Sequence, residues 1–488
     1  MIEAPLISSR SFIDGAWRTP VERLGVLHDP NTGVERTEQL GASADDVDAA
    51  LRAADLLHRT QTLERIPVEQ RAAALNAWAD TLDANTEEIA VQDAVSTGNP
   101  LRTTRTLAAF LGPRVRSIAR QATDIGDGRA LEAGGRTVRL LNRALGPTLV
   151  LAPWNAPTFV AVSKVSAAIG AASPALLKPS EWTPSGAQLA FELLHHVLEQ
   201  HGFPPATAQL IHGAARVGSS LSSDPRVRVI TFTGGMSAGR TVARAAAETL
   251  AVVQLELGSN NPAIVLPDAD IGRTADLLIA GATRLNGQWC EAPGKVLVPE
   301  TLHDDLVDAL LASAASLRID HGFRDDTQLG PLAYRGHHER LATQLARYAT
   351  AGAIVHRAGE LPDLGGWFFQ PAVVTGIDPV LARDEMFGPA LTVHAVPSVD
   401  EAIAAANLPG GGLDAFVFGE DEAAALDVGS QIRAGEVRIN GTYMADLAEG
   451  SEQTFWGTSG VGGHDSAHGV AFSQGRRVVG VDAPEQAI

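Results

Sequence analysis

The sequence contains very little cysteine: Cys290 is the single thiol among 488 residues. One cysteine excludes an internal disulfide and a metal site made of several thiolates, and it fits a reducing compartment. The histidines near 195–201 and 464–468 lack the spacing or the acidic company of a zinc motif. We therefore expect no metal centre, and the lone thiol has either a packing role or a chemical one.

Long apolar runs are also missing. No stretch of about eighteen apolar residues occurs, as a membrane-spanning helix would require. Glu3, Arg10 and Asp14 interrupt the apolar residues of the N-terminus, so no signal-peptide core is expected there. These absences predict a soluble cytoplasmic protein.

Positive charge is scarce. The chain has 38 Lys and Arg against 57 Asp and Glu, a net charge of −19. Such a surface repels phosphate backbones and anionic lipids, so we expect neither a nucleic-acid nor a membrane partner. Hydrophobic residues make up 45% of the chain, enough for real cores. Because a single core stops growing near about 250–300 residues, the length predicts two large lobes.

The periodicity of apolar residues divides the chain. Spacings of three and four residues predict a mostly helical first 125 residues, with helices over 43–59, 67–84 and 86–95 and a stop at Gly98. From Thr148 onward, short apolar runs alternate with helical stretches, which predicts right-handed crossovers and a mostly parallel sheet. Its strands are expected at 149–152, 175–177, 209–211, 227–232 and 252–257.

A second alternating series follows and predicts a second α/β lobe that meets the first near residue 258. Its strands are expected at 264–266, 296–298, 353–356, 372–374, 391–394, 415–418 and 437–439, with helices such as 302–316, 337–351 and 401–407 between them. Two short strand-like segments, 137–142 and 476–481, belong to neither series. They could pair with each other or with a neighbouring subunit.

Three residues at the ends of predicted strands or helices carry chemistry. Cys290 lies in a glycine-bearing loop, where a thiolate nucleophile can be presented, although a small buried hydrophobe is the alternative. Glu256 interrupts an apolar strand at its carboxyl end. It is either a general base with a raised pKa or one partner of an ion pair. Asn155 follows another strand and offers a neutral donor to an oxyanion, or merely caps a proline-rich turn.

Two features indicate a nucleotide site. The strand that ends at Phe232 runs into Thr233-Gly234-Gly235 and then into a helix, which directs unsatisfied amides at a phosphate. Lys178 and Glu181 leave the end of another strand, where they could bind ribose hydroxyls. The Glu181 carboxylate would repel a 2′-phosphate, so NAD is favoured over NADP.

Gly235-Met236-Ser237-Ala238-Gly239 matches the nucleophile elbow of serine hydrolases and lies between a predicted strand and helix. A hydrolase using Ser237 would need an acid and a histidine downstream, for which Asp414 and His464 or His468 stand in the right order. That hypothesis explains neither Cys290 nor Glu256. A nucleotide-binding protein without catalysis is a third alternative.

Taken together, six segments resemble motifs of the aldehyde dehydrogenase superfamily, in order, from about residue 10 to residue 480. They are Pro153-Trp154-Asn155-Ala156-Pro157 (P-W-N-x-P), Lys178-Pro179-Ser180-Glu181 (K-P-S-E), Phe232-Thr233-Gly234 (F-T-G), Leu255-Glu256-Leu257-Gly258 (L-E-L-G), Gly287-Gln288-Trp289-Cys290 (G-Q-x-C) and Glu385-Met386-Phe387-Gly388-Pro389 (E-x-F-G-P). The interval of 34 residues between Glu256 and Cys290 is also similar to that of the family.

The resemblance implies a hydride-transferring enzyme. The Cys290 thiolate would attack an aldehyde, and the Asn155 amide and the Cys290 N–H would hold the oxyanion. After hydride transfer to the nicotinamide, water activated by Glu256 would hydrolyse the thioester to a carboxylic acid. Within the family, a CoA-acylating enzyme is the alternative, against which the base Glu256 argues. The implied cofactor contacts are Pro153, Trp154, Lys178, Ser180, Glu181, Gly234, Gly235, Leu257, Gly258, Glu385 and Phe387.

The resemblance also implies a fold: two Rossmann-like doubly wound α/β lobes and a small β arm for oligomerisation. The NAD-binding domain is expected over 1–136 and 148–257, the catalytic domain over 258–467 and the arm over 137–147 and 468–488. The family forms homodimers or homotetramers.

Several positions depart from the family pattern. Ser259-Asn260-Asn261-Pro262 stands where G-K-x-P is more usual, and the segment 455–464 matches the glycine-rich family motif only loosely. That segment helps to shape the substrate mouth, so the departures concern substrate identity rather than the chemistry. The small Ala156 with aromatic neighbours favours an apolar or aromatic aldehyde. The expected pocket residues are Ala156, Phe159, Val160, Trp289 and Tyr443.

Overall fold

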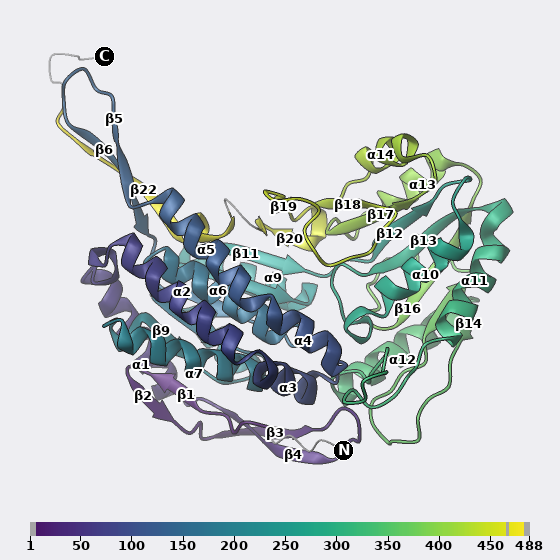
Figure 1. The fold of residues 1–488 in the computed structure, drawn as a ribbon, viewed down its shortest axis with the longest axis horizontal. Helices are drawn as coiled ribbons and strands as arrows, with labels where there is room; N and C mark the ends of the chain where they lie inside the picture. The colour runs from purple at the N-terminus through teal and green to yellow at the C-terminus, as the bar shows by residue number, and fades with distance from the viewer. Residues whose placement is uncertain (1–5, 465–467, 483–488) are drawn as a thin grey trace.

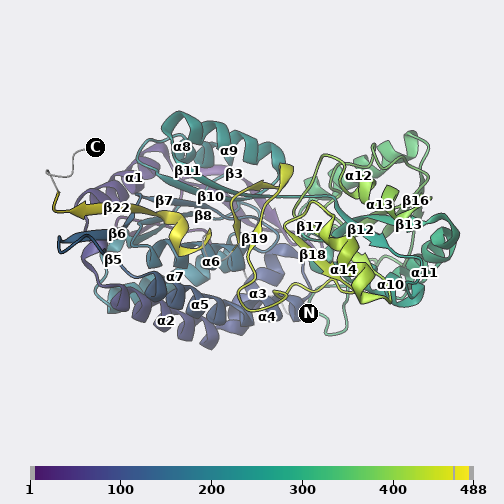
Figure 2. The same cartoon turned by 90° about the horizontal axis from the view of Figure 1, so that it is seen from above.

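The computed structural model describes residues 6–464 and 468–482 and contains two large, mainly parallel sheets (Figure 1). The predicted fold class is confirmed. Seen from above, the two lobes lie side by side, and a narrow arm extends from the far end of the first lobe (Figure 2). β11 ends at Leu257 and β12 begins at Asn261. We keep the division near residue 258 as our proposal for the domain boundary.

The first lobe is built on an eight-stranded sheet in the order β2-β1-β9-β8-β7-β10-β11-β20. Its five parallel strands are β7 (Thr148–Leu151), β8 (Ala175–Lys178), β9 (Ala208–Leu210), β10 (Val229–Gly234) and β11 (Val252–Leu257). Antiparallel strands complete its edges: β1 (Ser11–Ile13), β2 (Ala16–Arg18) and β20 (Gly460–Val461).

Helices cover both faces of this sheet because the side chains of buried parallel strands point alternately to each face. Val150 and Leu177 pack against one layer of helices, whereas Leu149, Leu151 and Leu176 pack against the other. The first layer is α2 (Val68–Ala84), α3 (Thr86–Thr97), α4 (Leu101–Ala109), α5 (Leu111–Ile125), α6 (Pro157–Gly170) and α7 (Ser185–Gln200). The second layer is α1 (Ala44–Arg59), α8 (Ala215–Ser222) and α9 (Met236–Thr249).

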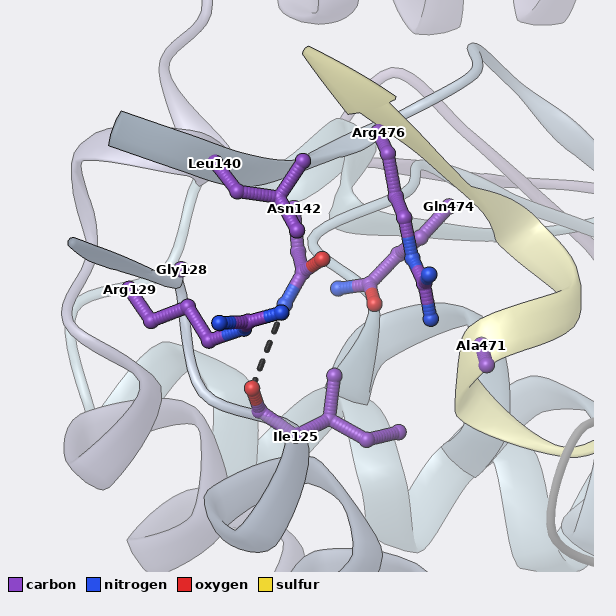
Figure 3. Close-up of a pocket in the computed structure, with 8 residues that line it drawn as sticks. All are labelled: Ile125, Gly128, Arg129, Leu140, Asn142, Ala471, Gln474 and Arg476. Carbon is purple, nitrogen blue, oxygen red and sulfur yellow. Dashed lines mark hydrogen bonds between the residues drawn. The ribbon is translucent and has the colours of Figure 1, made fainter. Parts of the chain in front are cut away.

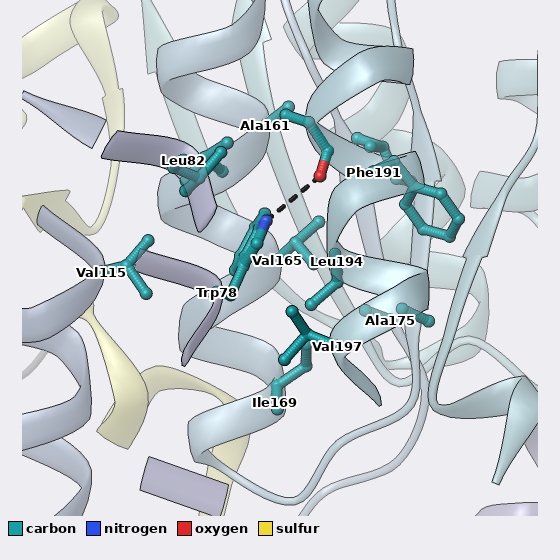
Figure 4. Packing of buried hydrophobic residues seen from close by; sticks show 14 of the residues in the cluster. Trp78, Leu82, Val115, Ala161, Val165, Ile169, Ala175, Phe191, Leu194 and Val197 are labelled. Atoms are coloured by element: carbon teal, nitrogen blue, oxygen red, sulfur yellow. Dashed lines mark hydrogen bonds between the residues drawn. The ribbon is translucent and has the colours of Figure 1, made fainter. Parts of the chain in front are cut away.

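Trp78 lies at the centre of the first helical layer (Figure 4). Its ring is buried, and its indole N–H donates a hydrogen bond of 3.1 Å to the Ala190 carbonyl of α7. The ring therefore fills the space between helices without leaving a buried donor unpaired.

The second lobe has a seven-stranded sheet in the order β14-β15-β16-β13-β12-β17-β18. Only β14 runs antiparallel to its neighbour. The strands are β12 (Asn261–Val265), β13 (Pro293–Pro299), β14 (Ile354–Arg357), β15 (Ala372–Thr375), β16 (Ala390–Val396), β17 (Asp414–Phe418) and β18 (Glu436–Ile439). α10 (Ile271–Ala282) and α11 (His303–Ala315) pack in one hydrophobic cluster, α13 (Val399–Ala406) and α14 (Glu422–Ser430) in another, and α12 (Arg335–Thr350) in a third.

The two leftover strand-like segments pair with each other in the arm. β6 (Val138–Ala144) lies antiparallel to β22 (Gln474–Gly480) and to β5 (Gly128–Leu131), in the order β22-β6-β5. At its base a cavity of about 250 Å³ lies between the arm and the end of α5 (Figure 3). There the Asn142 side chain donates to the Ile125 carbonyl at 3.2 Å.

The structure corrects the predicted helical character of the first 125 residues. β1, β2, β3 (Glu22–His28) and β4 (Glu35–Gly41) precede the first helix. β1 and β2 form a hairpin around Asp14 and Gly15, which both have positive φ, and Asp-Gly is a strong hairpin signal that the helical periodicity obscured.

The arm and the second lobe also differ from their predicted ranges. The arm sheet begins at Gly128, before the expected start at 137, and Val470 packs against the helices of the first lobe. β20, predicted within the second lobe, joins the first sheet beside β11. β20 is flanked in the chain by the paired strands β19 (Gln453–Thr454) and β21 (Gly463–His464). The predicted domain ranges also include residues 1–5, 465–467 and 483–488, which lie outside the described residues. Among the helices described, none combines the length and apolarity needed to cross a membrane.

Candidate active site

The carboxyl ends of the first sheet's parallel strands bring the predicted residues to one edge. Asn155 follows β7, Lys178 ends β8, Gly234 ends β10 and Glu256 lies in β11. Because neighbouring parallel strands end at the same side, segments distant in sequence meet there. β10 pairs with both β7 and β11, so these loops are adjacent.

The loop that carries Cys290 begins with a left-handed turn. Leu285, Asn286 and Gly287 have φ of +49°, +58° and +78°. Such conformations are costly for non-glycine residues and persist only where surrounding contacts enforce them. The Asn286 side chain supplies these contacts by donating to the carbonyls of Gly98 at 3.0 Å and Pro331 at 2.8 Å.

Residues of both lobes hold the loop. From the first lobe, the Asn155 amide donates to the Gln288 carbonyl at 2.9 Å. From the second, the Asn261 amide donates to the carbonyls of Cys290 at 2.8 Å and Ala292 at 2.9 Å. The sequence did not identify Asn261 or Asn286 as site residues. The Asn286-Gly287 dipeptide is a turn signal that could have identified the second, whereas Asn261 was noted only as a departure from the family pattern.

Glu256 and Cys290 meet directly, since the thiol and the carboxylate share a hydrogen bond. Burial raises the pKa of Glu256, and burial together with the Glu256 charge raises the pKa of the Cys290 thiol well above its ordinary value. One oxygen of Glu256, Oε1, is buried and has no hydrogen-bond partner among the described residues. The pair therefore rests as a thiol beside a carboxyl group that still has capacity to bind a polar ligand or water.

Glu385 forms a second buried carboxyl group nearby. Burial raises the pKa of Glu385 to about 8, and its Oε1 likewise finds no partner in the described part of the chain. Its side chain lies against Gly258, where any Cβ would collide with it. A ligand hydroxyl could satisfy the unpaired oxygen, so the residues present fit a ribose at this position.

Lys178 and Glu181 lie together at the end of β8, with Lys178 Nζ 3.5 Å from Glu181 Oε2. Burial lowers the pKa of Lys178, and Glu181 opposes that shift. Ser180 accepts a bond of 3.3 Å from the Trp182 N–H. Gly235 is the N-cap of α9 and has open space around its Cα, as close approach of a phosphate to a helix N-terminus requires.

Aromatic rings join the lobes beside these groups. The Trp154 ring lies edge-on to Phe387, with ring centres 5.3 Å apart at 83°, and also contacts Tyr334. Tyr334 stacks on Trp182 at 4.3 Å and 5°. The structure thus brings Trp154 together with Phe387, and it adds Trp182 and Tyr334, which sequence reasoning missed because stacking across lobes leaves no local sequence pattern.

The five expected pocket residues differ in burial. Trp289 is buried beside Cys290, and its indole N–H donates to Glu291 at 3.1 Å. Ala156 is the N-cap of α6, and Phe159 and Val160 are half-buried in the first turn of that helix. Phe159 packs partly against the core, and Tyr443 is 65% exposed.

The residues of the hydrolase alternative are not assembled. Ser237 is exposed in the first turn of α9. Asp414 is fully buried and accepts a hydrogen bond of 2.6 Å from Gln453. His464 packs edge-on against Phe455.

A thiol paired with a carboxyl group, at the edge of a doubly wound sheet that fits a dinucleotide, defines a thiol-dependent oxidoreductase. The model of the aldehyde dehydrogenase family matches residues 17–479. The chain therefore belongs to the aldehyde dehydrogenase family, and it is an NAD(P)-dependent enzyme that oxidises aldehydes.

Similar proteins and solved structures are also aldehyde dehydrogenases or related dehydrogenases. The 4-(hydroxymethyl)benzenesulfonate dehydrogenase TsaD1 of Comamonas testosteroni is 32% identical over 88% of this chain and 89% of its own length. A succinate-semialdehyde dehydrogenase [NADP(+)] of Mycobacterium tuberculosis is 32% identical over 90% of this chain and 96% of its own. Betaine aldehyde dehydrogenase of Staphylococcus aureus, solved with NAD+, has a TM-score of 0.91 and 27% identity, with 99% of both chains covered.

Aldehyde dehydrogenase C of Pseudomonas syringae, solved as a cysteine-to-alanine mutant with NAD+ and octanal, is also similar. Its TM-score is 0.89 and its identity 28%, over 97% of this chain and 96% of that one.

Proposed function

We propose that this enzyme oxidises an apolar or aromatic aldehyde to the carboxylic acid through a thioester on Cys290, with NAD preferred over NADP. The hydrogen bond between the Cys290 thiol and the Glu256 carboxylate carries the proposal. It provides a nucleophile and its base in one contact.

The first step forms a carbon–sulfur bond. The thiol proton leaves along its hydrogen bond to Glu256, and the sulfur attacks the aldehyde carbonyl carbon. The carbonyl oxygen becomes an oxyanion that the Cys290 N–H and the Asn155 amide stabilise. Asn155 uses one N–H on the Gln288 carbonyl, and an amide NH2 group retains a second donor for this purpose.

When bound, NAD would supply the acceptor for the hydride of the tetrahedral adduct. Lys178, Ser180 and Glu181 would hold its adenosine ribose, Gly234 and Gly235 its pyrophosphate, and Glu385 and Phe387 its nicotinamide ribose and ring. Pro153, Trp154, Leu257 and Gly258 would complete the site. The Glu181 carboxylate supports NAD, because it disfavours the 2′-phosphate of NADP.

Hydrolysis then releases the product. Glu256 first releases to solvent the proton that it took from the thiol. It then takes a proton from water, whose oxygen attacks the thioester carbonyl. The carbon–sulfur bond breaks as the acid forms, and the Cys290 thiolate recovers a proton from Glu256. The raised pKa of Glu256 suits a base that accepts a proton near neutral pH. A CoA-acylating enzyme would not need this base, so Glu256 favours the hydrolytic reaction.

The apolar or aromatic substrate rests on Ala156 and on the buried Trp289 ring beside the thiol. Two similar proteins support this choice. One is a 4-(hydroxymethyl)benzenesulfonate dehydrogenase, and the other was solved with octanal.

The test replaces the nucleophile. Cys290→Ala should abolish aldehyde-dependent NADH formation, because no other thiol exists in the chain. Ser237→Ala should retain it, since Ser237 lies outside the thiol site. NADH absorbance with benzaldehyde and octanal, with NAD or NADP and without CoA, gives the rates, and chromatography identifies the acid. A fully active Cys290→Ala variant, or a strict requirement for CoA, contradicts the mechanism.

We further propose that two or four copies assemble through the arm over 137–147 and 468–488, extended by β5. Val478 and Val479 of β22 are 63% and 52% exposed, and Val481 beyond it is 60% exposed. An outer strand with exposed valines is suited to pairing with a second copy.

A further inference from the structure

Arg284 carries a positive charge that the protein leaves uncompensated. In the part of the chain that the structure describes, its guanidinium makes neither a hydrogen bond nor a salt bridge, and its Nε is buried without a partner. The surrounding protein also disfavours the charge, since burial lowers the pKa of Arg284 and the nearby cation Arg438 adds to that shift. A half-buried cation without a counterion is costly, so a ligand anion would stabilise this position.

Arg284 stands in the segment that leads to the reactive thiol. It is the first residue of the turn 284–287 that leads to Cys290, and its Cζ lies 5.3 Å from the centre of the Trp289 ring. The hydrogen bond from the indole N–H to Glu291 fixes that ring. A substrate that approaches Cys290 along Trp289 would therefore bring its far end to the guanidinium.

The stack on Trp289 does not use the donors of Arg284. The contact is a cation–π contact, in which the positive charge and not a hydrogen bond is attracted to the ring, so the N–H groups stay available to another partner. Those donors match the paired oxygens of a carboxylate or sulfonate. The Tyr443 phenol lies near Arg284 and offers a further donor at the exposed side.

The neighbouring carboxylates interact with residues other than Arg284. Glu291 accepts from Trp289, Asp414 accepts from Gln453, and Glu436 is paired with Arg438. Arg438 also donates to the Ala445 carbonyl at 2.9 Å. Of these two arginines, Arg438 is thus neutralised within the protein, and Arg284 is the one that retains free donors.

Building on the proposed function, we propose that Arg284 binds an anionic group at the far end of the substrate. The substrate class is then an aromatic aldehyde with a carboxylate or sulfonate on the ring, whose ring lies against Trp289. This role makes Arg284 a specificity-determining residue that the expected pocket set did not include.

The experiment compares charged and neutral aldehydes. Steady-state kinetics of the wild type, Arg284→Gln and Arg284→Lys are measured with 4-formylbenzoate, 4-formylbenzenesulfonate and benzaldehyde. We expect the wild type to prefer at least one anionic aldehyde over benzaldehyde. In Arg284→Gln the ratio of kcat/KM for that anionic aldehyde to kcat/KM for benzaldehyde should fall at least about tenfold, chiefly through KM. Arg284→Lys should restore part of the ratio, because it keeps the charge but loses the paired donors.

Arg273→Gln is the matched control. Arg273 is an exposed arginine on α10, and its loss changes the net charge equally. Its specificity ratio should equal that of the wild type. A second readout does not depend on turnover: terephthalate should slow alkylation of Cys290 by iodoacetamide in the wild type and protect Arg284→Gln much less.

Two results would overturn the proposal. One is a wild type that prefers benzaldehyde over both anionic aldehydes. The other is an Arg284→Gln variant in which kcat falls equally for all three, which would indicate a structural role. In either case, Cys290-dependent oxidation of benzaldehyde would leave the proposed aldehyde dehydrogenase function intact, so the two failures are distinguishable.

Discussion

At the scale of single residues, the contact between Cys290 and Glu256 sets the reactivity of the free enzyme. The carboxylate accepts the thiol hydrogen and places a negative charge beside the sulfur, and both effects disfavour the thiolate. Glu291, the next residue along the chain, adds to this repulsion. The free enzyme should therefore hold an unreactive thiol at neutral pH.

Alkylation by iodoacetamide tests this electrostatic control. The rate should rise with pH from 7 to 10 without a plateau near the ordinary pKa of cysteine, about 8.5, because the folded protein raises the pKa of the thiol. Glu256→Gln removes one negative charge and should shift the profile to lower pH. Glu248→Gln, an exposed change on α9, should leave it in place. A plateau near pH 8.5 in the wild type would show that the carboxylate does not act on the sulfur.

The chemistry-bearing residues could be predicted from the sequence because reactive groups have few substitutes. The lone thiol, the charge within an apolar strand and the asparagine after a strand each stood out, and the structure brings Cys290, Glu256 and Asn155 together. Their catalytic roles stay our proposal. Asn261 and Arg284 were not predicted, because only the folded chain shows which groups surround them. Asn261 has hydrogen-bond partners in the Cys290 loop, whereas the guanidinium of Arg284 has none among the described residues.

At the scale of elements, the turn before Cys290 packs against the segment 385–389. A Cβ on Gly287 would overlap the backbone at Gly388 and Pro389, so the two family motifs form one packed unit. Backbone cannot move aside as a side chain can. Glycine is therefore required at this position both for its positive φ and for space.

Gly287→Ala should lower stability and activity together. The positive φ alone costs about 1 kcal/mol for alanine, and the overlap with backbone should raise the total above about 3 kcal/mol. Gly202→Ala is the matched control, because Gly202 has a φ of +72° with open space around its Cα. Thermal unfolding followed by circular dichroism should show a clearly larger fall in Tm for Gly287→Ala. Equal falls would mean that the contact with Gly388 is not restrictive.

Most elements of the two lobes followed from periodicity, since buried strands and amphipathic helices leave strong patterns. The short strands did not. β5, with the sequence Gly-Arg-Ala-Leu, has almost no apolar alternation and is held by pairing with β6. β20 has two residues, and its place beside β11 depends on tertiary contacts alone.

At the scale of the whole molecule, the arm extends away from both lobes (Figure 1). Val478, Val479 and Val481 are exposed there. In the described residues, β22 is paired on one side only, by β6. An exposed apolar strand edge promotes aggregation of a monomer, whereas in an oligomer a second copy can cover it.

Val479→Asp should weaken or abolish assembly, because a carboxylate on the outer strand cannot be buried between copies without a partner. Val380→Asp is the control: this valine is 40% exposed and lies outside the arm. Light scattering after size exclusion should give the monomer mass for Val479→Asp and the assembled mass for the wild type and the control. A monomeric wild type would contradict the proposed role of the arm.

The Cys290 loop is held by Asn155 from one lobe and by Asn261 from the other, with Asn286 reaching to Gly98. Neither half of the chain can shape this loop alone. During synthesis the sulfur emerges long before the last strand of its sheet, so a nascent chain carries it in a relaxed, unaligned loop. The loop is therefore aligned only after both halves have folded against each other, and a chain that stalls earlier carries the sulfur without the contacts from Asn155 and Asn261.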